Sequence, residues 1–403
     1  MSGVFTMKKN KIIMLLGLAG FIVMADNFVV SPILPAISQN LDIDIARAGL
    51  LITAYMIPFG FFQIVFGPLA DRFGKKQVIT IAISLFTLAT GLCALGSGFG
   101  SLSLFRALTG VFAASVMPIS FAMIGDIFPI KERQGAIGTF MGISFLGQGL
   151  SMAIGGTIAY FLNWRGVFVI YAVFALIPTF LLIKNYKSLP SDKHPDSKIF
   201  APYLKLLGTS RSLFTYIIVL LEGFFIIGSF SYAGVYISKT YGFNYLYIGL
   251  ILTAFGVMTV IGGRLSGKIA QKTGARKILG IGLALAALAD IVIYLFGSTL
   301  WLLIIGIALL GLGFIFAHST LLTRATEFAQ RARGAAMSLV AFFFMGGGGV
   351  GTAIGGKLIS ATSISKLFLI YGIALVVTLL LSFLMIRDHV VEPDEPKEEI
   401  GNL

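Results

Sequence analysis

The chain has 403 residues, of which 57% are hydrophobic and 12% are charged, and its mean hydropathy is +0.95. Soluble domains carry about twice this share of charged residues, so these values exclude a water-soluble globular protein. The net charge of +13 is assigned to short cytoplasmic loops of a membrane protein, with a lipid bilayer and not a nucleic acid as the partner.

Long apolar stretches predict an all-α integral membrane protein, because a transmembrane helix needs about 20 apolar residues and β-barrel strands would alternate in polarity instead. The first stretch follows the basic segment Met1–Lys11 without a small-residue cleavage site, which indicates a retained helix and not a signal peptide. We expect twelve spans, at residues 12–37, 47–70, 76–97, 101–124, 134–160, 165–185, 212–238, 246–270, 277–297, 300–323, 334–360 and 366–386.

The distribution of basic residues predicts the orientation, since cytoplasmic loops are enriched in Lys and Arg. With the N-terminus inside, inner loops and tails hold 24 of the 30 Lys and Arg residues, and outer loops hold four. Both termini are therefore expected to be cytoplasmic, in a bacterial cytoplasmic membrane.

Two halves are expected, because similar segments recur 200 positions apart. Residues 67–76 correspond to 267–276, residues 153–156 to 353–356, and Arg133 to Arg333. The predicted domains are a six-helix bundle at 1–185, a cytoplasmic linker at 186–211, a second six-helix bundle at 212–388 and an acidic tail at 389–403. Such repeats meet at a central cavity and give alternating access by rocking.

Three segments resemble signatures of the major facilitator superfamily. Residues 67–76, GPLADRFGKK, are similar to its loop 2–3 signature G-x-L-A-D-R-x-G-R-K, with Lys75 in place of Arg. Arg106 and Gly110 resemble its fourth-helix signature. The fifth helix resembles its antiporter signature, except that Ser151 and Met152 stand where that signature has Gly-Pro. The resemblance implies the major facilitator fold, and the nearest likeness is to the twelve-helix drug:proton antiporters.

Asp26 and Arg106 are the first candidates for proton coupling. Asp26 lies about 21 Å from the inner end of the first helix, at 1.5 Å per residue, and a charge at such depth indicates function. Burial disfavours an ionised carboxyl, so Asp26 is expected to bind and release a proton near neutral pH. Arg106 is long enough to reach it, and the resemblance assigns this arginine to proton coupling.

Glu222 is the third proton-coupling candidate, because the repeat places it one turn from the counterpart of Asp26 and therefore on a second cavity wall. Polar and aromatic residues on helices expected to line the cavity are candidate substrate contacts. They are Asn27, Ser31, Tyr55, Gln148, Tyr232, Tyr236 and His318.

The resemblance also implies an inner gate at the cytoplasmic helix ends. Asp71 would face the start of the eleventh helix near Arg333, and Lys75 would pair with Asp126. The full set of candidate gating residues is Gly67, Asp71, Arg72, Gly74, Lys75, Asp126 and Arg333.

No nucleotide, metal or other cofactor site is predicted. The glycine run Gly346–Gly349 is followed by Gly356 and Lys357 inside an apolar span, without the Gly-Lys-Ser/Thr that a phosphate-binding loop requires. The single cysteine, Cys93, forms no cluster with histidines. The proton gradient is therefore the expected energy source, and the chain is not expected to be an enzyme.

The sequence thus predicts a monomeric proton-coupled transporter that exports small amphipathic or cationic compounds, a multidrug efflux protein. Three alternatives remain open: an exporter or symporter of sugars, nucleosides or other metabolites; a lysolipid flippase of the same fold; and a receptor that transports nothing.

Overall fold

The computed structural model describes residues 8–189, 201–328 and 333–386. Within these ranges the chain is helical without strands, and twelve helical spans are long and apolar enough to cross a membrane. The expected all-α architecture of twelve spans is therefore confirmed. The predicted tail at 389–403 lies outside the described residues, as do residues 190–200 of the linker.

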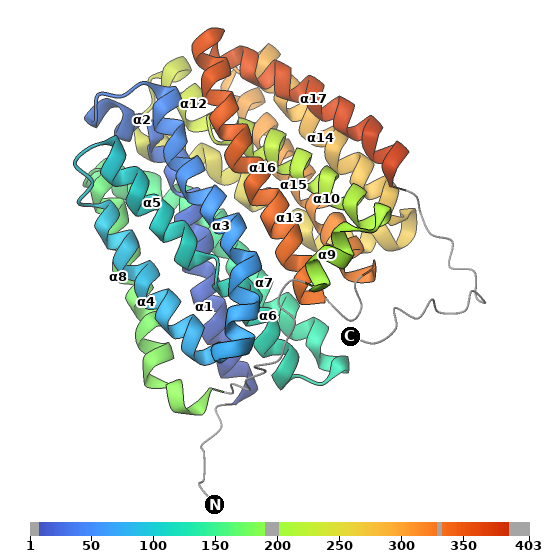
Figure 1. The fold of residues 1–403 in the computed structure, drawn as a ribbon. Coiled ribbons are helices and arrows are strands. Elements are labelled where there is room, and N and C mark those ends of the chain that lie inside the picture. Colours follow the sequence, from blue (N-terminus) through green and yellow to red (C-terminus); the bar gives the residue numbers. More distant parts are fainter. Residues whose placement is uncertain (1–7, 190–200, 329–332, 387–403) are drawn as a thin grey trace, which may run out of the picture.

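Six spans form the first half of the molecule, which Figure 1 shows in blue to green. They are α1 and α2 (Lys9–Phe28, Val30–Asn40), α3 (Ile45–Phe73), α4 (Lys75–Cys93), α5 and α6 (Phe99–Ala113, Val116–Ile127), α7 (Ile130–Phe161) and α8 (Trp164–Lys184).

Six spans form the second half, from α10 to α17. The first consists of α10 (Ser210–Glu222), the π-helix η2 (Gly223–Ile227), α11 (Gly228–Phe230) and α12 (Ala233–Tyr241). The others are α13 (Tyr245–Thr273), α14 (Ala275–Phe296), α15 (Leu300–Phe328), α16 (Arg333–Ala361) and α17 (Ile364–Met385).

The predicted linker range contains two short helices that the hydropathy pattern did not indicate, η1 (Tyr186–Ser188) and α9 (Ala201–Leu207). Tyr203 of α9 donates a hydrogen bond from its hydroxyl to the carbonyl of Ile64 on α3, at 3.2 Å. We call the end of the molecule that carries α9 the linker side, and the end where α2 and α12 finish the far side (Figure 1).

The structure repeats the sequence offset of 200 in its turns. Gly74 and Gly274 have φ angles of 103° and 91°, and each joins a long helix to the next with one residue between them. Side chains with a Cβ rarely adopt this backbone region, so glycine is required at both turns.

Two predicted spans of the first half are interrupted, and a proline explains each of these breaks. Proline has no backbone N–H to donate four residues back. Pro32 therefore leaves the carbonyl of Phe28 without its helical partner, and the first span breaks at Val29. Pro118 does the same for the carbonyl of Ala114, and the fourth span breaks at Ala114 and Ser115.

The halves are in close contact on the far side. A Cβ placed on Gly256 of α13 would lie 2.2 Å from the Cα of Gly149 on α7, and one placed on Gly156 would lie 2.9 Å from the Cα of Gly249. Glycines allow this approach, as is usual between membrane helices. Gly142, a further seven residues toward the linker side, has no neighbour within 4 Å of such a Cβ. The two helices therefore diverge toward the linker side.

The packing within the first half can be tested at Gly147. A Cβ added to this residue would lie 2.1 Å from the carbonyl oxygen of Phe21. We expect Gly147→Val to lower the apparent melting temperature of the detergent-purified protein by several degrees, because overpacking costs about 1–3 kcal/mol. Gly142→Val, on the same helix, is the matched control and should leave it unchanged. Equal melting temperatures would contradict the packing.

Candidate functional site

The main cavity lies between the two halves and contains about 660 Å³ of empty space, part of which is open to solvent. Its wall holds five methionines, six phenylalanines, four other apolar residues and four polar residues. It is lined by Met24, Phe28, Phe59, Gln63, Met117, Pro118, Phe121, Met141, Phe145, Gln148, Phe314, His318, Leu322, Met337, Ser338, Val340, Ala341, Phe344 and Met345. Apolar walls with few polar groups are typical of small-molecule sites.

Sequence reasoning missed most of this wall. The methionines, the phenylalanines and Gln63 had no polarity or motif to distinguish them from residues that pack or face lipid. Of the predicted substrate contacts, Gln148 and His318 line the cavity. The Nε2 atom of Gln148 is buried and has no hydrogen-bond acceptor among the described residues, so this amide is free to donate to a bound compound.

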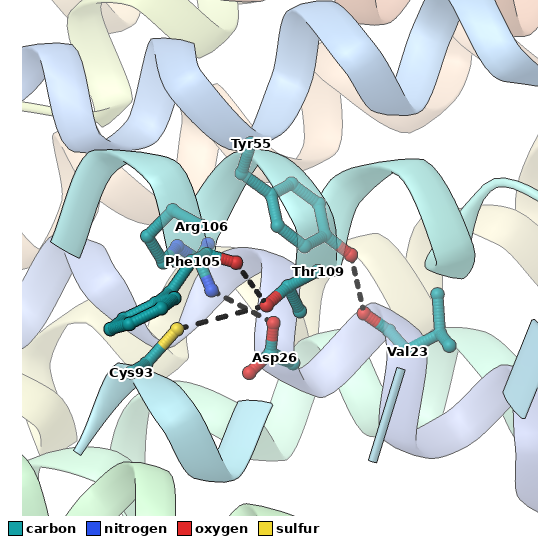
Figure 2. Close-up of polar contacts among 7 residues, drawn as sticks. All are labelled: Val23, Asp26, Tyr55, Cys93, Phe105, Arg106 and Thr109. Carbon is teal, nitrogen blue, oxygen red and sulfur yellow. Dashed lines mark hydrogen bonds and ion pairs between the residues drawn. The ribbon is translucent and has the colours of Figure 1, made fainter. Parts of the chain in front are cut away.

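Asp26 and Arg106 form an ion pair inside the first half. The Nη1 atom of Arg106 donates to Oδ2 of Asp26 at 2.8 Å, and the two side chains are 1% and 0% exposed. The guanidinium also lies over the ring of Tyr55, 4.3 Å from its centroid. Figure 2 shows these side chains gathered between α1, α3 and α5. Each charge would be unstable alone at this depth in the hydrocarbon, and the two opposite charges stabilise each other.

Close backbone packing brings Arg106 to this position. A Cβ on Gly110, one helical turn beyond Arg106, would lie 2.2 Å from the carbonyl oxygen of Tyr55. Only glycine lets α5 approach α3 so closely, which sets the guanidinium against the Tyr55 ring. The Tyr55 hydroxyl in turn donates to the carbonyl of Val23 at 3.4 Å (Figure 2).

The Asp26 carboxylate does not face the cavity, contrary to our expectation. Met24 and Phe28 line the cavity, and a residue between them is turned by about 200° on an α-helix. Asp26 therefore points into the first half toward Arg106. Tyr55 was expected to contact substrate and instead covers this ion pair. It lines neither described cavity.

Glu222 and His318 form a second pair, inside the other half. The Nδ1 atom of His318 lies 3.1 Å from Oε2 of Glu222, and the side chains are 9% and 0% exposed. His318 lines the cavity and Glu222 lies behind it. The prediction that Glu222 itself faces the cavity is therefore wrong. His318 was expected to contact substrate and not Glu222, because nothing in the sequence links two residues 96 positions apart.

The remaining substrate candidates lie outside the main cavity. Asn27 and Ser31 line a smaller cavity beyond it. The Tyr232 hydroxyl donates to the carbonyl of Thr352 at 2.9 Å, and the Tyr236 ring packs edge-on against Phe368. Tyr236 packs within the second half, whereas the Tyr232 hydroxyl also lies against Gly49 of α3 in the first half. Neither tyrosine lines a described cavity.

The gating candidates meet within the first half. The Nζ atom of Lys75 lies 2.7 Å from Asp126 and 3.5 Å from Asp71, so the pairing with Asp126 occurs as the resemblance implies. Among the described side chains, Asp71 forms an ion pair with Lys75, and its expected position near Arg333 stays a prediction. Arg333 begins α16, but its side chain lies outside the described part.

The other three gating candidates lie around this cluster. Arg72 is exposed on the ring of Phe73, with 5.8 Å to the centroid. Gly74 makes the turn between α3 and α4. A Cβ on Gly67 would lie 3.7 Å from the Tyr203 hydroxyl of α9. The loop 2–3 segment therefore ties α3, α4 and α6 together at the linker side.

Asp290 is a further buried carboxyl, on α14, and has no cationic partner among the described residues. Its neighbours include Gly372 on α17, whose added Cβ would lie 3.2 Å from the Asp290 Cβ. Asp290 lines neither described cavity, so we do not place it on the path of a bound compound.

The sequence pattern of the Major Facilitator Superfamily matches residues 16–272 and 229–402. The chain therefore belongs to this superfamily of membrane transporters and is an integral membrane transport protein, not an enzyme.

Relatives and a solved structure agree with this assignment. The uncharacterized MFS-type transporter YceJ of Bacillus subtilis (strain 168) is 28% identical over 85% of this chain and 87% of its own length. The puromycin resistance protein pur8 of Streptomyces alboniger is 32% identical over 43% of this chain and 34% of its own. Other relatives are named as hexuronate, citrate and sugar transporters. The names therefore do not define one cargo.

The crystal structure of a bacterial homolog to the human lysosomal transporter Spinster, inward-facing and unoccupied, has the same fold. Its TM-score is 0.78 at 18% sequence identity, and the match covers 94% of this chain and 97% of that one. At this identity the likeness concerns the fold alone.

The ion pair of Asp26 and Arg106 can be tested through stability. Arg106→Gln should destabilise the protein by about 3–5 kcal/mol, because it leaves a buried carboxylate without its partner. The double variant Asp26→Asn, Arg106→Gln should recover part of this loss. A double-mutant cycle in thermal unfolding measures the coupling, and strictly additive effects would contradict the pair.

Proposed function

We propose that this protein is a proton-coupled secondary transporter that exports small amphipathic or cationic compounds by alternating access, a multidrug efflux protein. The observation that carries the proposal is the combination of an apolar, aromatic cavity between two halves with a buried ionisable pair in each half. The cavity supplies a site for cargo, and the pairs supply sites for the coupling ion.

The composition of the cavity wall favours aromatic, largely apolar cargo. Methionine adapts its shape to different surfaces, and aromatic rings attract cations to their faces. A sugar would need many hydrogen-bond partners, whereas the wall offers four polar side chains, Gln63, Gln148, His318 and Ser338. Among the predicted contacts, we propose Gln148 and His318 as those that touch cargo.

The state of the first pair supports proton antiport. Here the halves are closed on the far side and the Asp26 carboxylate is paired with Arg106, as expected of a carrier that has released its proton toward the linker side. Separation of the pair would favour the neutral carboxyl. A proton would then bind from the far side and leave when the pair re-forms.

The second pair, Glu222 and His318, would couple proton binding to cargo binding. His318 lines the cavity and Glu222 lies directly behind it, so a cation in the cavity would favour the neutral imidazole. Protonation of the pair and binding of a cationic compound would thus oppose each other. Mutual exclusion of this kind is what antiport requires.

We further propose that the linker side is cytoplasmic, in a bacterial cytoplasmic membrane, and that one chain suffices for transport. The contact of Lys75 with Asp126 would hold the cytoplasmic ends of α4 and α6 together. With Gly67, Asp71, Arg72, Gly74 and Arg333, these residues would form the inner gate.

A second candidate is export or symport of a neutral metabolite such as a sugar or nucleoside. The free Nε2 donor of Gln148 favours it, as does the relative named as a probable sugar efflux transporter. The two candidates share the proton site and differ in which compounds occupy the cavity.

Proton flux in liposomes tests the proposal. An imposed pH gradient should be discharged by ethidium, a permanently charged aromatic cation, and not by sugars or nucleosides. Asp26→Asn should slow the discharge at least about tenfold, because Asn cannot bind and release the proton that the carboxyl carries. Asp42→Asn is the matched control, since Asp42 is exposed with φ of 49°, a conformation that Asn tolerates.

Each outcome of this experiment has a distinct meaning. Discharge by sugars or nucleosides in place of ethidium would keep proton coupling and overturn the cargo class. Equal rates for wild type and Asp26→Asn would overturn the role of Asp26. Absence of any proton movement with the whole panel would overturn proton-coupled transport.

A further inference from the structure

A second, smaller cavity lies beyond the main one toward the far side, and Phe28 belongs to the walls of both. The smaller cavity has room for about one water-sized group. Its wall includes Asn27 and Ser31 from the first half, and Phe230 and Ser231 from the second. The two cavities thus lie in series along the boundary between the halves.

A partition between the cavities is built by one aromatic residue from each half. The ring centroids of Phe28 and Phe230 lie 6.4 Å apart, and the side chains are 6% and 1% exposed. Asn27 adds a polar contact across the same boundary, since its Nδ2 atom donates to the sulfur of Met345 at 3.8 Å. Because every contact of this partition joins one half to the other, rocking of the halves would open it.

The backbone also breaks at this partition in both halves. Phe28 is the last residue of α1, directly before the break at Val29. Phe230 is the last residue of α11, directly before the turn at Ser231 and Tyr232. The two aromatic side chains therefore sit at the points where the first and seventh spans can bend.

A second barrier closes the smaller cavity toward the far side. The Ser31 hydroxyl lies 3.2 Å from the carbonyl oxygen of Phe230 and 3.3 Å from that of Ser231. A Cβ on Gly234 would lie 2.5 Å from the carbonyl oxygen of Ser31. The smaller cavity is thus a chamber between two barriers, and not an extension of the main cavity.

Apart from the amide of Asn27, the polar groups of the chamber offer hydrogen-bond acceptors. The carbonyl oxygens of Phe230 and Ser231 face the Ser31 hydroxyl, whose oxygen can itself accept a hydrogen bond. The hydroxyl of Ser231 is already engaged, by the carbonyl of Ile227 and by Thr352. A group with N–H or O–H donors would replace the contacts that bind Ser31.

We propose that this chamber is a second cargo subsite on the release path, gated by Phe28 and Phe230, and that it takes the hydrogen-bond-donating head group of an amphipathic compound, such as an ammonium. The aromatic tail stays in the main cavity until the gate opens. This inference rests on the proposed function for its cargo, whereas the gate itself can be measured without any transport.

Thiol accessibility measures the gate. Cys93 is the single natural cysteine, so Cys93→Ser gives a background without thiols. On it, Ile52→Cys reports on the chamber and Ser338→Cys on the main cavity. A membrane-impermeant trimethylammonium methanethiosulfonate is added on the linker side of membrane vesicles. Ser338→Cys verifies that this side is exposed to the reagent.

We expect Ser338→Cys to react at least about tenfold faster than Ile52→Cys, since a closed gate adds a barrier for the reagent. Phe28→Ala should remove most of this difference. Phe145→Ala is the matched control, because it takes the same ring from the wall of the main cavity alone, and it should change nothing. If Phe28→Ala fails to fold, Phe28→Leu is used for the same test. Its melting temperature is measured first to show that it folds.

Two results would overturn the gate: equal reaction rates at the two cysteines with the gate intact, or no acceleration at Ile52→Cys in either Phe28 variant. Because no cargo or proton gradient is involved, these results are independent of the proposed function. Loss of ethidium-driven proton flux would overturn that function and leave the gate standing.

Protection of Ile52→Cys tests the head-group chemistry in the Phe28→Ala background. The probes are 2-phenylethylammonium and its trimethyl derivative, which have the same ring and charge but differ in N–H donors. The first should slow the labelling at least about fivefold, close to the value of one hydrogen bond, and the second should not. Equal protection by both, or by neither, would overturn the donor-binding subsite.

Discussion

The rest of the structure depends on one constraint: charged side chains inside the membrane must be paired within the protein. The ion pair between Asp26 and Arg106 meets this constraint in the first half. Hydrocarbon solvates neither charges nor unpaired backbone groups, so a transporter that uses ionisable residues has to hold their partners within its own helices. Asp26 meets Arg106 at 2.8 Å, and Glu222 meets His318 at 3.1 Å. Once these charges are paired inside the halves, the boundary between the halves can remain apolar and available to cargo.

The two halves share a backbone plan and differ in chemistry. The turns at Gly74 and Gly274 match at an offset of 200, and Ser31 meets the carbonyl of Ser231 at the same offset. The ionisable pairs do not match. In the first half the pair is sealed away from the cavity, whereas in the second half His318 lies on the cavity wall. This asymmetry agrees with the proposed function, in which the pair of Asp26 and Arg106 binds a proton and the pair of Glu222 and His318 also responds to cargo.

Hydropathy predicts most of the fold, because each of the twelve spans must bury its own backbone in apolar surroundings. The pairing of Lys75 with Asp126 follows from a signature whose spacing is nearly intact. The reach of Arg106 to Asp26 follows from depth and side-chain length. Each span is thus contained in its local sequence, whereas the two ion pairs join different helices and were expected from the resemblance and from side-chain reach.

Features that depend on the rotation of a helix about its axis could not be predicted in this way. Asp26 and Glu222 were expected on the cavity wall, but tertiary packing turns both toward partners within their own half. The phenylalanines of the cavity resemble those that face lipid, and only the approach of the other half distinguishes them. The helix breaks before Pro32 and Pro118 could not be predicted either, because they depend on which backbone carbonyls find hydrogen-bond partners elsewhere.

We propose that loss of the Asp26 charge drives the change of the two halves from one state to the other. Spin labels at Asp42→Cys and Lys239→Cys, both exposed on the far side, report the separation of the halves by double electron–electron resonance. In the Cys93→Ser background, acidification should increase the population of long distances, and Asp26→Asn should show that population already at neutral pH. Distances that do not change with pH, or an Asp26→Asn variant that stays closed, would contradict the account.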